Sequence, residues 1–150
     1  MARAFEGIRV ADFTQVLSGP YLTAQLALEG ADVIKVEPPG VGDQMRNRMI
    51  PSPHASHDMA SAFLALNLGK RSLAVDLKDP RGQQVVQRLL ESADVVAQNF
   101  RGGVAEHLGL SYEQVCAINP KVVYCQITGF GAGGPRGSQA AYDGAVQAAS

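Results

Sequence analysis

The sequence has no excess of charge of either sign. Its 150 residues carry 13 Lys and Arg against 14 Asp and Glu, which gives a formal net charge of −1. General nucleic-acid-binding proteins usually carry a marked basic excess, so we expect no nucleic-acid partner. The balance is still compatible with a local basic patch that holds one phosphorylated small molecule.

Cysteine is scarce. The only two, Cys116 and Cys125, do not form a CxxC pair, and no histidines accompany them at the spacing of metal ligands. We therefore predict no metal site. We expect both cysteines to be buried, reduced thiols that pack as small apolar residues.

Long hydrophobic runs are missing too. No apolar stretch approaches the roughly 18 residues of a membrane-spanning helix. The first residues lack the apolar segment of a secretory signal. We expect a cytoplasmic protein without a membrane partner.

Short apolar runs alternate with helical patterns along the chain. Gly30 is placed to end the first helix, and Asp79 and Ser111 are placed to cap later ones. Residues 37–57 and 129–137 are expected to be loops, and residues 60–66 could be helical or extended. The predicted strands cover residues 8–13, 32–36, 72–76, 94–98 and 122–128, and the predicted helices cover residues 21–28, 79–92, 103–108, 111–118 and from 142 onward.

Strands separated by helices in this way indicate βαβ units. The predicted fold class is α/β, a Rossmann-like open parallel sheet with helices on both faces. The last helical pattern has no stop signal before Ser150. We expect residues 1–150 to be an incomplete N-terminal domain of a longer protein.

In open α/β sheets, ligands bind beyond the carboxyl ends of the strands. Residues 14–20, 37–40, 99–103 and 129–135 follow predicted strands in this way. The first of these segments lacks the GxGxxG spacing, which disfavours a nicotinamide cofactor. Asn99, Phe100 and Arg101 offer an amide, an apolar wall and a cation, which suits a phosphorylated ligand with an apolar arm. The alternative is a core phenylalanine beside a solvated arginine.

Several charged residues can each be interpreted either as structural or as part of a site. Asp12 lies inside an apolar strand, so it is either a hydrogen-bonded structural residue or part of a site. Lys70 and Arg71 form either a surface pair or a phosphate contact. Asp143 is either the N-cap of the last helix or a site residue.

Many short motifs, in order, resemble the start of one enzyme family. They are the run Gly7-Ile8-Arg9-Val10-Ala11-Asp12-Phe13-Thr14 with Gly19-Pro20, the run Gly30-Ala31-Asp32-Val33-Ile34-Lys35-Val36-Glu37 with Gly42-Asp43 and Arg46, the run Leu66-Asn67-Leu68-Gly69-Lys70-Arg71-Ser72, then Asn99-Phe100-Arg101, Gly129-Phe130-Gly131 and Tyr142-Asp143. Together they resemble family III CoA-transferases, the CaiB/BaiF-like group that includes carnitine CoA-transferases and formyl-CoA transferases.

The resemblance implies a reaction that moves CoA from an acyl-CoA to a carboxylic acid through a covalent aspartyl intermediate. It implies an interlocked homodimer, and CoA as a substrate rather than a permanently bound cofactor. The nucleophilic aspartate of the family lies in a Gly-Asp segment that would come after Ser150. We therefore expect no catalytic residue within this chain, and no activity from the chain alone.

The resemblance also implies which residues line the CoA site. These are Val16, Leu17, Ser18, Arg71, Val75, Asn99, Phe100, Arg101, His107 and Leu108. Three positions depart from formyl-CoA transferases. Leu17 replaces a glutamine, Ala62 stands near a tyrosine position, and Pro38 replaces a basic residue. These departures disfavour an oxalate and formate substrate pair.

Two other functions compete with the transferase. An α-methylacyl-CoA racemase of the same fold needs an acid/base pair, and a histidine precedes the aspartate of the last helix in that subgroup. Here that position is Tyr142, whose phenol is a poor proton acceptor at neutral pH, so the transferase is favoured. The other alternative is a CoA-binding module without catalysis.

Overall fold

The computed structural model describes residues 2–47, 57–131 and 133–150. Within them, a five-stranded, all-parallel sheet has the order β3-β2-β1-β4-β5. The strands are β1 (Arg9–Asp12), β2 (Asp32–Glu37), β3 (Arg71–Ala74), β4 (Val95–Gln98) and β5 (Val123–Gln126). This sheet confirms the predicted α/β class. Residues 48–56 of the predicted loop at 37–57 lie outside the described residues.

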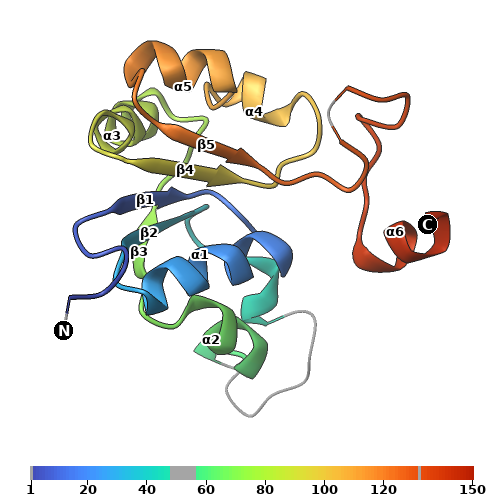
Figure 1. The fold of residues 1–150 in the computed structure, drawn as a ribbon, viewed down its shortest axis with the longest axis horizontal. Coiled ribbons are helices and arrows are strands. Elements are labelled where there is room, and N and C mark those ends of the chain that lie inside the picture. Colours follow the sequence, from blue (N-terminus) through green and yellow to red (C-terminus); the bar gives the residue numbers. More distant parts are fainter. Residues whose placement is uncertain (1, 48–56, 132) are drawn as a thin grey trace.

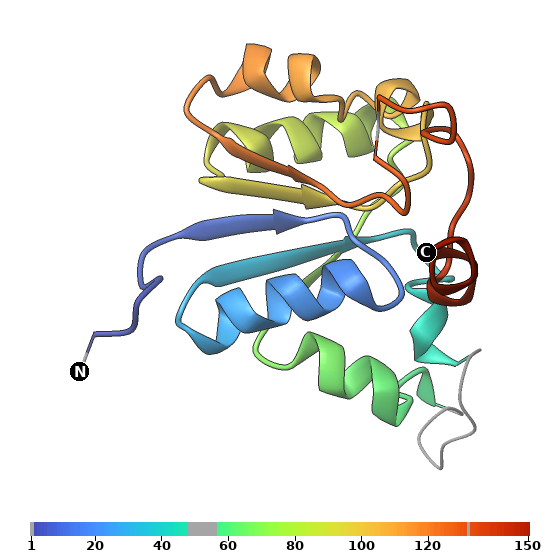
Figure 2. The ribbon, with the colours of Figure 1, turned by 45° about the vertical axis from the view of Figure 1, so that its right-hand side comes forward.

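Helices cover both faces of the sheet, as Figures 1 and 2 show. One face carries α1 (Ser18–Leu28) with α2 (Ser61–Asn67) packed beside it, and the other carries α3 (Pro80–Glu91), α4 (Val104–His107) and α5 (Tyr112–Ile118). A short 3-10 helix, η1 (Gln44–Arg46), lies near α2. The last helix, α6 (Asp143–Ala149), stands away from the sheet in Figure 1 and has no buried residue.

Local side-chain chemistry explains several helix boundaries. Asp79 accepts a hydrogen bond from the Arg81 N–H and precedes Pro80, so it caps α3 as predicted. Ser111 and Gln114 form a capping box at the start of α5. Gly30 follows α1 with a φ of 106°, which glycine adopts without strain.

Other boundaries differ from the prediction. Helix α1 begins at Ser18 rather than residue 21, because the Tyr21 N–H already bonds the Leu17 carbonyl. The prediction that Asp143 caps α6 is wrong. Tyr142 is the N-cap, and the Asp143 carboxylate instead accepts a hydrogen bond from Gln147 at 2.8 Å. The ambiguous segment at 60–66 is the helix α2.

The two faces of the sheet have different cores. Under α3 and α5, large apolar side chains such as Leu90, Val96 and Val115 are 1%, 0% and 0% exposed. Under α1 the cluster is smaller and is built from Val10, Ala27, Ala31 and Val33. The cysteines are free and half-buried rather than buried.

The described residues were also compared with what a membrane-spanning helix and a metal site require. Among them, no helix is long and apolar enough to cross a membrane. The same residues hold no group of His, Cys, Asp and Glu that could bind a metal ion.

Candidate functional site

The strand order of the described sheet has a topological switch point between β1 and β4. The chain leaves β1 toward β2 on one side and leaves β4 toward β5 on the other, and the helices of these two connections cover opposite faces. The crevice between two such strands, at their carboxyl ends, is the usual ligand site of open α/β sheets. The segments after β1 and β4 border it.

Those two segments are joined directly by the side chain of Asn99. Its Oδ1 accepts from the Gln15 N–H at 2.8 Å, and its Nδ2 donates to the Gln15 carbonyl at 2.7 Å. Residues 16–18 and 99–101 therefore lie at the same edge of the sheet. A CoA site made from both segments requires this arrangement.

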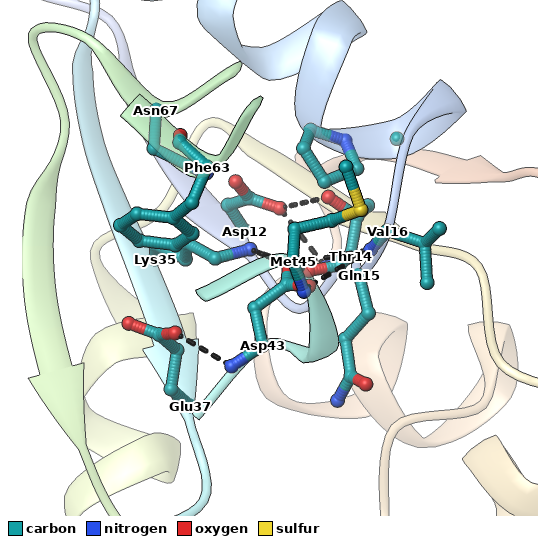
Figure 3. A network of polar contacts seen from close by, with 12 residues as sticks. Asp12, Thr14, Gln15, Val16, Lys35, Glu37, Asp43, Met45, Phe63 and Asn67 are labelled. Carbon is teal, nitrogen blue, oxygen red and sulfur yellow. Dashed lines mark hydrogen bonds and ion pairs between the residues drawn. The ribbon is translucent and has the colours of Figure 1, made fainter. Parts of the chain in front are cut away.

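Val16 has an unusual backbone conformation in this segment. Its φ is 69°, in the left-handed region that β-branched residues rarely adopt. The Asp43 carboxylate accepts from the Val16 N–H at 3.2 and 3.3 Å, and Lys35 forms an ion pair with Asp43 at 2.9 Å. Figure 3 shows these side chains converging on the loop after β1. The strained residue is held by a buried ion pair.

Helix α1 begins beside this switch point, after the loop that follows β1. Its N-cap residue, Leu17, makes no side-chain capping bond, and the first turn contains no acidic residue. Helix N-termini attract anions through their backbone N–H groups and the helix dipole. Gly19 lies against Thr14, since a Cβ on Gly19 would come within 2.3 Å of the Thr14 Cβ. The helix start is therefore packed tightly onto the end of β1.

A second buried ion pair lies beneath α1. Asp12 accepts hydrogen bonds from the Thr14 N–H, the Thr23 hydroxyl and Lys70 Nζ, the last at 3.0 Å. This confirms the structural reading of Asp12. The surface-pair reading of Lys70 is wrong, because its side chain is only 2% exposed and also bonds Pro20 and Asn67. Burial lowers the pKa of Lys70 below its usual range, although the neighbouring Asp12 charge opposes this shift.

Glu37 ends β2 at the same edge. Arg46 binds its carboxylate at 2.9 and 2.6 Å and lies over the Phe63 ring at 3.9 Å. Burial alone would raise the pKa of Glu37. The hydrogen bonds from Arg46 and the Asp43 N–H outweigh burial and lower that pKa below its ordinary 4.5. Glu37 is therefore held as a carboxylate.

Phe100 and Arg101 match the alternative interpretation of this segment, a core phenylalanine beside a solvated arginine. The Phe100 ring is half-buried and packs against the core, while Arg101 is exposed. Gln98 accepts from the Phe100 N–H at 2.7 Å, which fixes the start of this loop. An exposed cation in this segment can still meet a ligand phosphate.

The remaining predicted site residues are more scattered. Val75 follows β3 at the carboxyl edge but is buried in the core, and His107 is exposed at the end of α4. Leu108 lines a hollow with Val86 and Leu90, toward α3. Arg71 begins β3 at the opposite edge, where its guanidinium binds Asp32 at 3.0 Å. The structure does not bring Arg71 together with residues 16–18.

A cavity of about 390 Å³ lies at the carboxyl ends of β4 and β5, where Gln98, Gln126 and Gly102 line it. Glu106 and Glu113 contribute to its wall, together with Tyr112 and Tyr124. Burial raises the pKa of Tyr124 above its usual value. Acidic walls do not favour a phosphorylated ligand, so this cavity does not replace the crevice as the candidate site.

Two residues that support the loop after β1 are not among the predicted site residues. Lys35 and Asp43 occur only as members of the family motifs. A signal was available, because Lys35 is a charged residue inside an apolar strand, as Asp12 is.

An open parallel sheet of this order, with helices on both faces, defines a Rossmann-like α/β protein. The model of CoA-transferase family III matches residues 5–150, and the chain belongs to that family.

Individual relatives agree with this assignment. The chain is 41% identical over 148 residues to a succinyl-CoA:glutarate CoA-transferase of Mus musculus, covering 99% of this chain and 33% of the relative. It is 46% identical over 133 residues to a formyl-CoA:oxalate CoA-transferase of Afipia carboxidovorans, covering 89% and 31%. The chain thus spans about a third of the length of these curated relatives.

Solved structures share the fold. A CaiB/BaiF family protein from Brucella suis has a TM-score of 0.89 at 39% identity, covering 99% of this chain and 39% of that one. A hypothetical protein from Mycobacterium tuberculosis has a TM-score of 0.84 at 40% identity, covering 95% of this chain and 38% of that one. The predicted fold and family are therefore both confirmed.

Proposed function

We propose that this chain supplies the CoA-thioester site of a CoA-transferase. The full reaction moves CoA from an acyl-CoA to a carboxylic acid. The observation that carries the proposal is the pair of bonds between Asn99 and the Gln15 backbone, at 2.8 and 2.7 Å. They hold the segments after β1 and β4 side by side at the switch point.

Each part of the crevice suits one part of a CoA ester. The uncapped start of α1, with Leu17 and Ser18 exposed, faces the thioester end. The exposed cation of Arg101 faces a phosphate, and Phe100 backs the pantetheine arm. CoA then acts as a substrate that leaves in every cycle, with no permanent cofactor. Val75, His107 and Leu108 stay secondary members of this proposal, and Arg71 is left out of it.

The covalent chemistry belongs to an aspartate that we place beyond Ser150. Its carboxylate attacks the donor thioester carbonyl and expels CoA thiolate, which leaves a mixed anhydride. The thiolate then attacks the aspartyl carbonyl and releases the donor acid. The acceptor carboxylate attacks the resulting aspartyl thioester and expels CoA thiolate, which leaves a second anhydride. The thiolate then attacks the acceptor carbonyl of this anhydride, which forms the acceptor's CoA thioester and frees the aspartate. On this proposal the chain alone is inactive, and the complete protein is an interlocked homodimer.

Tyr142 favours transfer over racemisation. It is the N-cap of α6 and is 57% exposed, at the position where the racemase reading needs a histidine. A tyrosine there does not supply the proton-accepting imidazole that exchange of an α-proton requires. The succinyl-CoA:glutarate and formyl-CoA:oxalate enzymes that this chain resembles are also CoA-transferases.

The test has a binding arm and an activity arm. Calorimetric titration of the protein with CoA should give saturable binding, and Arg101→Ala should weaken it by about tenfold. Arg88→Ala is the matched control, because Arg88 is an exposed cation in the last turn of α3, away from the crevice. Equal effects of the two substitutions would contradict the site.

The activity arm uses the protein expressed from the complete gene. Labelled CoA should move from succinyl-CoA or formyl-CoA to a carboxylic acid, with glutarate and oxalate as first acceptors. Loss of α-deuterium from a 2-methylacyl-CoA, without any transfer, would instead identify a racemase. Saturable CoA binding by the complete protein with neither reaction would identify a binding module.

A further inference from the structure

The backbone of the segment after β1 is held at successive peptide groups by side chains from elsewhere. Lys35 Nζ donates to the Thr14 carbonyl at 2.8 Å. Asn99 binds both the N–H and the carbonyl of Gln15. Asp43 accepts from the Val16 N–H. The chain is thus fixed from Thr14 to Val16, immediately before the two residues that face the thioester in the proposed function.

Val16 needs this support more than its neighbours do. Its φ of 69° is unfavourable for a β-branched residue, and such a conformation persists only where the surroundings enforce it. Its side chain packs with Met45, Phe63 and Leu66, which holds the residue from one side. The Asp43 carboxylate, which also accepts from the Met45 N–H, holds the Val16 backbone N–H.

Asp43 and Lys35 are both buried, with side chains 0% and 2% exposed. Burying two charges for packing alone is unfavourable compared with an apolar pair of the same size. An ionised carboxylate, however, can accept from the Val16 and Met45 N–H groups while it binds Lys35. Lys35 in turn reaches the Thr14 carbonyl, so the ion pair holds both ends of the segment.

We propose that Asp43, held by Lys35, is a positioning residue that fixes Val16 in its left-handed conformation. This sets where Leu17 and Ser18 present their backbone to the CoA thioester. The role at the thioester rests on the proposed function, whereas the effect on the backbone does not.

The conformational part is tested by amide hydrogen exchange. Asp43→Asn keeps the shape of the side chain but removes its charge and one acceptor. The Val16 amide should exchange at least about tenfold faster in this variant, because local opening becomes easier. Lys35→Gln breaks the same ion pair from the other side, so it should give the same change.

Lys70→Met is the matched control. Lys70 has the same side-chain exposure as Lys35, 2%, but it pairs with Asp12 and contacts Pro20 and Asn67. This variant should lower the Tm and leave Val16 exchange unchanged. The positioning role is overturned if Lys70→Met speeds Val16 exchange as much as Asp43→Asn does, or if neither Asp43→Asn nor Lys35→Gln speeds it.

The functional part is tested in the complete enzyme. Asp43→Asn should lower kcat by about 10- to 100-fold while KM for the CoA ester changes by less than about threefold, because displaced reacting groups cost rate more than binding. Adding Val16→Gly should restore at least about tenfold of that loss, since glycine adopts positive φ without strain. A merely structural Asp43 would show no such rescue.

The two proposals can fail separately. If the enzyme transfers no CoA but Val16 exchange still depends on Asp43, the proposed function is wrong and the positioning of the backbone stands. If the enzyme is active and Asp43→Asn leaves kcat unchanged, the positioning role at the thioester is overturned.

Discussion

The two faces of the sheet are stabilised by different means. Under α3 and α5, apolar side chains such as Leu90 and Val96 fill the space, each at most 1% exposed. Between α1 and the carboxyl ends of β1 and β2, buried charges take their place, with Asp12 bound to Lys70 and Asp43 bound to Lys35. The candidate CoA site borders the charged region.

The difference is instructive because the two kinds of core tolerate different amounts of change in their geometry. Apolar packing is favourable in almost any arrangement of the right volume. A hydrogen-bonded charge network tolerates only its own geometry, since any unpaired member is costly. A loop in a strained conformation, such as the one containing Val16, is supported by the second kind.

The strongest test of this comparison removes one member of a buried pair. Lys70→Met leaves the Asp12 carboxylate without its cation, and we expect it to lower the free energy of unfolding by about 3–5 kcal/mol. Urea denaturation followed by circular dichroism measures this change. A loss below about 1 kcal/mol would mean that water replaces the cation, and that this region is not a closed network.

The apolar face should respond to a cavity instead. Leu90 is 1% exposed, and Leu90→Ala should cost about 2–5 kcal/mol through lost burial and the space left behind. Leu64→Ala is the control, because Leu64 is 40% exposed and its removal leaves no cavity. CoA affinity should be unchanged in both variants, and a loss in Leu90→Ala alone would show that the two faces are coupled.

The sequence predicted the apolar face better than the charged one. The alternating strands and helices, and the caps at Asp79 and Ser111, depend on residues that lie close together in the chain. The structure confirms them. The burial of Lys70 depends on Asp12, 58 positions away, so a local pattern could only suggest a surface cation. Nothing local indicates that Val16 has a positive φ, because the side chains that enforce it come from β2 and the turn before η1.

In the candidate site, too, the sequence predicts some features and misses those that depend on the three-dimensional arrangement. The family resemblance groups residues 16–18 with residues 99–101, and the structure places the two segments close together, since they follow neighbouring parallel strands. The resemblance also groups Arg71 with these residues, but Arg71 begins its strand, and a one-dimensional motif does not distinguish the two edges of a sheet. For Asn99, only the structure reveals that its amide bonds both the N–H and the carbonyl of Gln15.

Glu37 gives the charged region a pH dependence. Its pKa lies below 4.5 in the folded protein, so its contribution to stability is present above that value and is lost as the pH falls through the lowered pKa. Glu37→Gln should lose about 1–3 kcal/mol at neutral pH, where wild type has the ionised hydrogen bonds to Arg46. The gap between the stabilities of wild type and variant should narrow in urea titrations as the pH falls below about 4.5, because glutamine does not titrate. A gap that stays constant would mean that Glu37 contributes through shape alone.

The smallest effect is expected at the opposite edge of the sheet. Arg71 is 67% exposed and shares Asp32 with Arg9, so Arg71→Ala should change stability by less than about 1 kcal/mol. Its distance from the crevice also predicts unchanged CoA affinity, in contrast to Arg101→Ala. Calorimetry on both variants compares the two edges directly. If Arg71→Ala weakened CoA binding as much as Arg101→Ala, the ligand would have to reach the amino-terminal edge, and a site confined to the carboxyl ends of the strands would be wrong.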